Sequence, residues 1–136
     1  MNDQQIESEI QARGLTAPRV TPQDIEANIA SEHYFTAADG YVGGLTTEDI
    51  QAMPTNADGL PVVTAPAPLE LLTFCVLILS NGFTVTGESA CASPENFDAE
   101  LGRKIARQNA VNKIWPLMGY ALKQRLYEQS LTGDAE

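Results

Sequence analysis

The chain has 136 residues, a formal net charge of −10, and 43% hydrophobic residues. This length suits one domain with an ordinary core and excludes a large multidomain enzyme. The excess of acidic residues makes double-stranded nucleic acid an unfavourable partner, because its phosphates attract proteins mainly through Lys and Arg.

No segment of the sequence is typical of a membrane or secreted protein. The longest apolar run, Phe74 to Leu79, is far shorter than the ~20 residues of a membrane helix. The N-terminus lacks the basic and apolar regions of a signal peptide. Two cysteines, Cys75 and Cys91, are too few for a disulfide-rich secreted scaffold. We therefore expect a cytoplasmic protein with reduced thiols and no membrane partner.

The N-terminal 40 residues predict two short helices. The first covers residues 3–13, where Ile6 and Ile10 share a face. The second begins after Thr21, whose hydroxyl can cap a helix that has Pro22 at its first position.

A strand and a long loop are expected next. Residues 33–36 have strand composition, and the Ala-Ala-Asp-Gly sequence at 37–40 indicates a turn. Residues 41–70 are rich in Pro and Gly, which predicts a surface loop with one short helical segment at 47–50.

The strongest local signal is Asn81-Gly82, between residues 71–80 and 83–88. This dipeptide predicts a β-hairpin with a type I′ turn, which needs positive φ at both central residues. The first strand is apolar on both faces, so we expect it to be central. The second alternates apolar and polar residues, as is typical of a strand nearer an edge.

A long helix should follow the hairpin. Ser93 is the expected cap, with Pro94 at the first helical position. Phe97, Leu101 and Ile105 recur every four residues and predict a buried edge.

Pro116 should make this helix kink or restart, since proline lacks a backbone donor. Residues 127–136 are expected to be a flexible tail. The predicted fold is α+β: a small antiparallel sheet based on a hairpin, packed against a long C-terminal helix, with short N-terminal helices. We expect a single domain over residues 1–136, with residues 1–40 as N-terminal helices and strand, 41–70 as loop, and 71–126 as hairpin plus helix.

The charges divide sharply along the chain. Residues 1–102 carry fifteen acids and two bases, residues 103–125 carry six bases and no acid, and the remainder carries three acids. Arg103 and Arg107 are four residues apart and project from one helix face.

This basic segment has three open interpretations. The arginine pair can bind a phosphate through forked donors, with Phe83 or Phe97 stacking on a base. The bases can instead pair with the acidic remainder of the chain or with another copy. They can also form a merely solvated helix face.

Catalytic motifs are missing from the sequence. His33 is the only histidine, and neither it nor the cysteines have a metal-ligand spacing. Gly43-Gly44 lacks the Lys-Ser/Thr of a phosphate-binding loop. We therefore expect no enzyme, no metal and no cofactor; a nucleophile pair of Cys91 and His33 would require the fold to bring them together.

The run from Leu72 to Ala110, followed by Trp115-Pro-Leu-Met-Gly-Tyr, resembles the small tailed-phage protein family named after podophage gene products forty-nine and sixty-six. Leu15 to Thr21 and Ser31 to Gly40 look like its N-terminal part. This resemblance implies a phage or prophage origin and action in an infected or lysogenic bacterium.

The hairpin and the following helix are also similar to Thoeris anti-defence proteins of the first described type. Those proteins bind cyclic ADP-ribose signals, and some bind cyclic oligonucleotides, without cleaving them. The similarity implies an oligomer, a dimer or an assembly of dimers, with ligand pockets between subunits.

The sequence-level hypothesis is therefore a non-enzymatic sponge for a cyclic nucleotide immune signal. The candidate ligand-binding residues are Phe83 and Phe97 for stacking, Asn96 for a polar edge, and Arg103 and Arg107 for phosphate. Phe97 has a competing role in the predicted buried edge. The alternative function is a small phage adaptor whose basic helix docks an acidic protein or another subunit.

Overall fold

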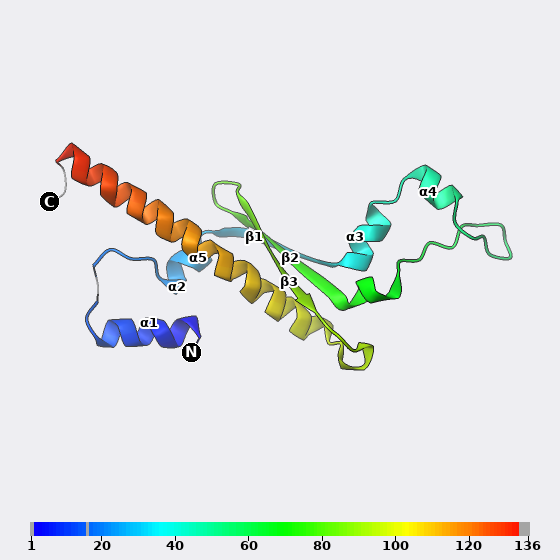
Figure 1. Ribbon diagram of the computed structural model, residues 1–136, viewed down its shortest axis with the longest axis horizontal. Coiled ribbons are helices and arrows are strands. Elements are labelled where there is room, and N and C mark those ends of the chain that lie inside the picture. Colours follow the sequence, from blue (N-terminus) through cyan, green and yellow to red (C-terminus); the bar gives the residue numbers. More distant parts are fainter. Residues whose placement is uncertain (1, 16, 134–136) are drawn as a thin grey trace.

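The computed structural model of the protein describes residues 2–15 and 17–133 (Figure 1). It contains a three-stranded antiparallel sheet packed against one long helix, with short helices before and between the strands, so the α+β prediction is confirmed. In chain order the elements are α1 (Asp3–Ala12), α2 (Pro22–Ala27), β1 (Ile29–Thr36), α3 (Ala37–Gly43), α4 (Thr47–Gln51), η1 (Ala67–Leu71), β2 (Leu72–Leu79), β3 (Thr84–Ala90), η2 (Pro94–Asn96) and α5 (Ala99–Thr132). Across the described ranges, none of these helices is both long and apolar enough to span a lipid bilayer.

The sheet has the strand order β1-β2-β3, with β2 in the centre and β3 at an edge, as predicted. Alternate side chains of β2 point to opposite faces. Those toward α5, including Cys75 and Leu77, are fully buried, whereas Phe74, Val76 and Ile78 on the other face are half-buried. The core therefore lies in the single layer between the sheet and α5.

The hairpin is confirmed, but the predicted type I′ turn is wrong. Gly82 has φ of +89°, and no described non-glycine residue has positive φ, so Asn81 is not left-handed. Leu79 accepts a hydrogen bond from the Gly82 N–H and donates one to the Phe83 carbonyl, both at 2.8 Å. These bonds define a three-residue loop in which only glycine needs positive φ. The Asn81 side chain accepts from the Phe83 N–H at 2.9 Å, which supports this geometry.

The N-terminal part of α5 contacts the sheet through small residues, and farther along Val111 and Ile114 are buried in the core. A Cβ atom at Gly87 of β3 would lie 2.1 Å from the Ala106 carbonyl and 2.3 Å from the Ala110 nitrogen. Ala106 and Ala110 are fully buried. The prediction of a buried edge was wrong, because Leu101 is 53% exposed and Ile105 44% exposed.

The long helix begins later than the sequence suggests. Pro94–Asn96 form a single 3-10 turn, and the Ser93 side chain makes no capping bond. Asp98 is the N-cap, accepting from the Leu101 N–H at 3.0 Å. The predicted cap at Ser93 is therefore wrong, and Phe97 precedes the helix.

The same helix continues through Pro116 to Thr132, so the predicted restart does not occur. The flexible tail expected over residues 127–136 is wrong for residues 127–132, which belong to α5. Residues 134–136 lie outside the described residues.

The N-terminal helices form as predicted. Asn2 and Thr21 close capping boxes at α1 and α2, respectively. The predicted turn over residues 37–40 is wrong, because Thr36 and Asp39 close another capping box and begin α3 there. The segment 37–71, called the arm below, holds α3, α4 and η1, and extends away from the sheet and α5 (Figure 1). The short helical segment predicted at 47–50, within the loop expected over residues 41–70, is confirmed as α4.

Candidate functional site

The basic residues of α5 have different surroundings. Arg107 binds two carboxylates, with Nη2 at 2.9 Å from Glu26 and Nε at 3.1 Å from Glu32. Lys104 lies 3.3 Å from Glu100, one turn earlier on the same exposed helix face. The other four bases form no ion pair with any residue that the structure describes: Arg103, Lys113, Lys123 and Arg125.

Arg107 belongs to a hydrogen-bonded chain between α2, β1 and α5. The Tyr34 hydroxyl donates to Glu32 at 2.8 Å, and the other oxygen of Glu32 accepts from Arg107. The bond from Tyr34, followed by the bond from Arg107 and its positive charge, lowers the pKa of Glu32. Burial and the bond to Glu32 raise the pKa of Tyr34, and the bond to Glu26 raises that of Arg107. A phosphate on Arg107 would have to displace these carboxylates.

Arg103, one turn earlier, lines a cavity of about 90 Å³ beside β1. Phe97, Tyr34 and Thr73 form other parts of the wall, and Asp39 is also present. One oxygen of the Asp39 carboxylate accepts the Thr36 N–H at 2.9 Å, at the start of α3. We call this space the Arg103 cavity.

A second space of about 130 Å³ adjoins the first on the β3 side of α5. It is lined by Asn96 and by the outward-facing Leu101 and Ile105, and it shares Phe97 and Thr73 with the Arg103 cavity. The structure therefore brings Asn96, Phe97 and Arg103 together at one end of the sheet.

Phe83 is not part of this cluster. It follows the hairpin loop at the opposite end of β2 from Thr73, and its side chain is exposed. The six residue-to-residue steps from Thr73 to Leu79 along β2 place the two ends about 20 Å apart. Within one chain, Phe83 cannot stack on a base whose phosphate contacts Arg103.

Sequence reasoning missed the contribution of β1 and α3 to this site. Tyr34 and Thr36 of β1 line the Arg103 cavity, and Asp39 joins them because α3 begins directly after its N-cap, Thr36. A signal for this was present: Thr36 and Asp39 have the same spacing as Thr21 and Asp24, which predicted α2.

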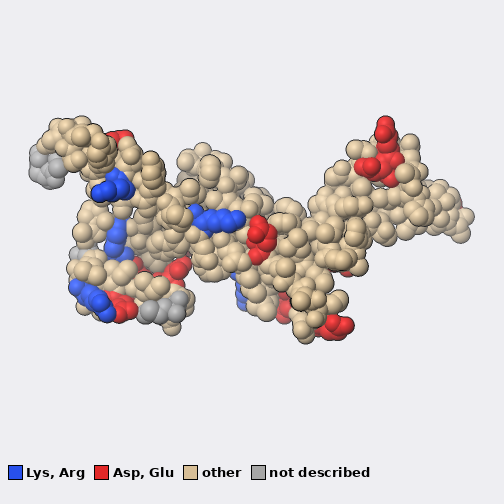
Figure 2. All heavy atoms as spheres, viewed as in Figure 1, with Lys and Arg blue, Asp and Glu red and all other residues tan. Residues whose placement is uncertain are grey.

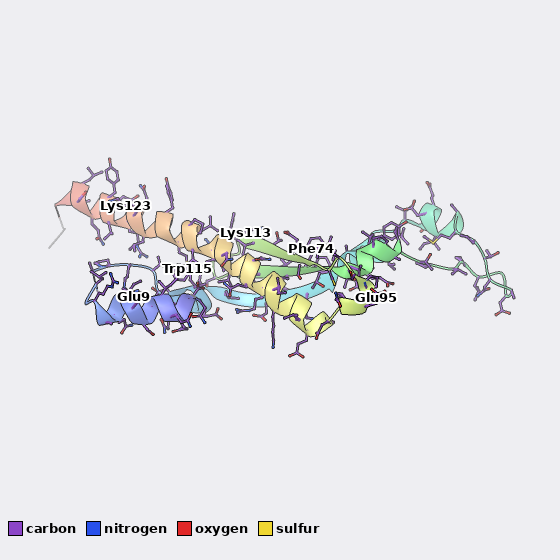
Figure 3. The ribbon with its side chains drawn as sticks, turned by 60° about the horizontal axis from the view of Figure 1, so that its bottom comes forward. Glu9, Phe74, Glu95, Lys113, Trp115 and Lys123 are labelled. Atoms are coloured by element: carbon purple, nitrogen blue, oxygen red, sulfur yellow. The ribbon has the colours of Figure 1, made fainter. Side chains whose placement is uncertain are left out.

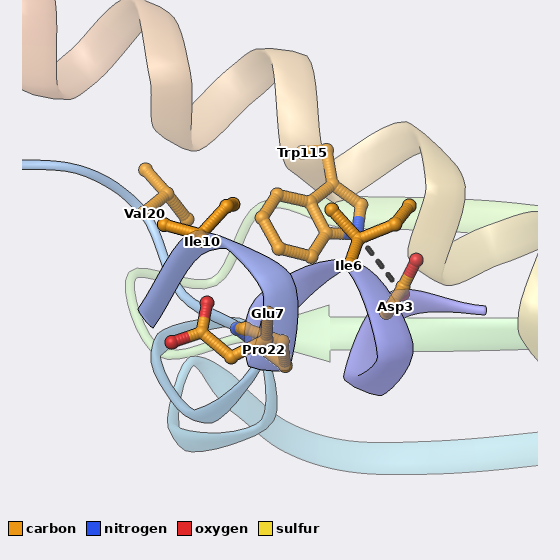
Figure 4. Close-up of a pocket in the computed structure, with 7 residues that line it drawn as sticks. All are labelled: Asp3, Ile6, Glu7, Ile10, Val20, Pro22 and Trp115. Atoms are coloured by element: carbon orange, nitrogen blue, oxygen red, sulfur yellow. Dashed lines mark hydrogen bonds between the residues drawn. The ribbon is translucent and has the colours of Figure 1, made fainter. Parts of the chain in front are cut away.

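Another cavity, of about 220 Å³, lies between α1 and α5 (Figure 4). Trp115 points into it, opposite Ile6 and Ile10, and donates a hydrogen bond to Asp3 at 3.3 Å. Its lining is mostly apolar. It marks the packing of α1 on α5 and contains none of the candidate residues.

The charge pattern of the surface follows the division seen in the sequence. In Figure 2 the basic side chains lie over the body of the molecule, and the arm shows only acidic ones. The arm contains five acids and no base over residues 37–71. The acidic residues of the arm are thus set apart from the basic residues of α5, which lie on the body of the molecule.

A protein-family model described as phage protein (N4 Gp49/phage Sf6 gene 66) matches residues 20–126. The matched range includes the whole sheet, both cavities around Phe97 and most of α5. No curated protein and no solved structure matches the chain.

Proposed function

Because the chain belongs to the phage protein (N4 Gp49/phage Sf6 gene 66) family, we propose that it is a non-enzymatic phage protein that sequesters a cyclic nucleotide immune signal in the cytoplasm of its bacterial host. The observation that carries this proposal is Arg103, which lines a cavity beside an aromatic ring and has no carboxylate partner among the described residues. A guanidinium in that position offers forked donors to a phosphate.

The two adjoining spaces suggest how the ligand is arranged. The Arg103 cavity, at about 90 Å³, has room for a phosphate group rather than a whole nucleotide. The neighbouring space with Asn96 and Leu101 offers a polar edge and an apolar wall to a base. The ligand would stay partly outside one chain, which supports a homo-oligomer whose second copy completes the pocket.

Calorimetry with cyclic ADP-ribose isomers and cyclic oligonucleotides tests the proposal. At least one ligand should bind tightly, and Arg103→Ala should weaken it roughly tenfold or more, since a hydrogen bond to a charged group is lost. Lys104→Ala is the matched control, because Lys104 is the adjacent exposed base and lines neither space. Arg107→Ala should have a smaller effect than Arg103→Ala, because Glu26 and Glu32 occupy its donors.

The absence of heat with every one of these ligands would contradict the proposal. Mass spectrometry of ligand released by denaturing the complex separates a sponge from an enzyme. A sponge returns the molecule unchanged, whereas an altered molecule would make the protein an enzyme.

The alternative proposal is an adaptor that binds a phage or host protein. It is favoured by the C-terminal half of α5, where four large side chains are 40% to 74% exposed: Leu117, Tyr120, Tyr127 and Leu131. Association with a protein that Tyr120→Ala weakens, without binding of any nucleotide, would support the adaptor over the sponge.

A further inference from the structure

A cavity lined by both polar and apolar side chains lies far from Arg103, toward the other end of α5. It has a volume of about 430 Å³ and is formed by α2, the hairpin loop and the C-terminal half of α5. This volume falls in the range of small-molecule sites. Arg125 lines it, 22 residues after Arg103 on the same helix, which corresponds to about 33 Å. We call this space the α2–α5 cavity.

The floor of the α2–α5 cavity is fixed by hydrogen bonds between α2 and the hairpin loop. The Ser80 N–H donates to the Asn28 carbonyl at 2.9 Å, and the Ser80 hydroxyl donates to it at 3.3 Å. The Asn28 side-chain oxygen also accepts from the Ser80 N–H. The amide NH₂ group of Asn28 has no hydrogen-bond acceptor among the described residues, so its donors remain available.

Most of the polar groups around the cavity are donors. Arg125 has no carboxylate partner within the described part of the chain. Arg19 donates to Glu7 through both Nη atoms. The acidic Asp24 uses one carboxylate oxygen to accept the Thr21 N–H at 2.9 Å. Free donors thus outnumber free acceptors, and this favours a ligand with anionic oxygens.

The rest of the lining is apolar. Val20, Met118 and Leu122 are half-buried and form a wall next to Arg125. A ligand held here needs an apolar body against this wall and an anionic group at the guanidinium.

We propose that the α2–α5 cavity is a second ligand site, independent of Arg103, for a small organic anion that carries a carboxylate or phosphate on an apolar body. Arg125 and the Asn28 amide bind the anionic group, and Met118 and Leu122 contact the body.

Methionine-methyl NMR of the full chain tests this site. Met118 lines the cavity, whereas Met53, the other methionine in the described part of the chain, lies on the arm and serves as an internal control. Phenyl phosphate and benzoate share a ring and differ in their anionic group. Both should shift the Met118 signal saturably and leave that of Met53 unchanged. Benzyl alcohol keeps the ring but lacks the charge. Its affinity should be at least roughly tenfold lower than that of the two anions.

Variants distinguish this site from other surfaces. Arg125→Ala should weaken phenyl phosphate roughly tenfold, and Arg125→Lys should recover part of the loss, since it keeps the charge without the planar fork. Lys123→Ala and Arg103→Ala should have no effect, because neither residue lines this cavity (Figure 3 labels Lys123). No shift of Met118 at millimolar probe, or equal binding by Arg125→Ala, would overturn the proposal. If Arg103→Ala still binds phenyl phosphate, the α2–α5 cavity is independent of the proposed nucleotide site, and each proposal can fail without the other.

Discussion

Gly87 faces the backbone of α5 at a distance that leaves no space for a side chain. The obstruction is the carbonyl of Ala106 and the nitrogen of Ala110, which are backbone atoms and cannot rotate away. At this point of the core, glycine is required by close approach rather than by an unusual backbone angle.

Gly87→Ala should therefore lower the free energy of unfolding by about 3 kcal/mol, because either β3 or α5 must shift to admit a methyl group. Gly119→Ala is the matched control: a Cβ there meets nothing within 4 Å, and alanine favours the helix by up to about 1 kcal/mol. Denaturation with urea, followed by circular dichroism, measures both. Equal stability of the two variants would contradict the close contact.

Glu7 is the buried acid of the N-terminal region. Its carboxylate accepts from both Nη atoms of Arg19, at 2.5 and 2.6 Å, and from Gln11 at 2.7 Å. These bonds, led by those from Arg19, lower the pKa of Glu7 from 4.5 to about 2. The unfolded chain therefore takes up this proton at a higher pH than the folded one does.

The stabilisation by Glu7 should be complete above pH 4.5 and disappear as the pH falls toward 2. Glu7→Gln removes this titration, so the difference in thermal midpoint between wild type and variant should shrink over that interval. Thermal unfolding monitored by circular dichroism at a series of acidic pH values measures it. Glu9→Gln, which alters an exposed pair with Arg13, should change the midpoint little at any pH. A difference between Glu7→Gln and wild type that is independent of pH would contradict the argument.

At the scale of elements, the start of α5 depends on one side chain. Asp98 accepts the Leu101 N–H, whereas Ser93 accepts no capping bond. Asp98→Ala should lower the free energy of unfolding by about 1 kcal/mol, and Ser93→Ala should leave it nearly unchanged. Urea denaturation of the two variants checks this; a larger loss for Ser93→Ala would restore the cap expected from the sequence.

The elements that the sequence predicts correctly are those set by local chemistry. Asn81-Gly82 predicts the hairpin, and the Thr21 capping box predicts α2. The same chemistry at Thr36 was overlooked because Ala-Ala-Asp-Gly resembles a turn when read without the residue before it. The turn type differs because the Asn81 side chain bonds to Phe83, which keeps its backbone at negative φ.

The N-terminal part of the buried face of α5 could not be found from large apolar residues. Periodicity favours Leu101 and Ile105, but the sheet approaches this part of the helix so closely that Gly102, Ala106 and Ala110 face it, and large buried residues follow only at Val111 and Ile114. The large side chains lie beside this contact and line the space next to Asn96. The candidate site could likewise be predicted only in part. The charge pattern of the sequence identifies Arg103, whereas the cavity beside it depends on the positions of β1 and α3 in the fold.

At the scale of the whole molecule, the two ends of the arm contact the sheet and its middle does not. α3 and η1 both contact β1 and β2, whereas α4 has at most sparse contacts with the other described elements. Leu60, Val62 and Val63 on the arm are exposed.

Limited digestion with thermolysin, which cleaves before such apolar residues, should therefore cut the arm first. The two fragments should stay together, because β1 pairs with β2 along most of its length. Gel filtration of the nicked protein, followed by denaturing electrophoresis, checks this. Trypsin provides the control, because the sequence has no Lys or Arg between Arg19 and Arg103. Separation of the thermolysin fragments without denaturant would contradict the pairing.

The glycine contact on β3 also determines how α5 can respond to a ligand. A helix that touches a strand backbone to backbone cannot roll about its axis or slide along it without steric overlap. Binding near Arg103 or near Arg125 should therefore leave the position of α5 on the sheet unchanged, although both residues belong to that helix.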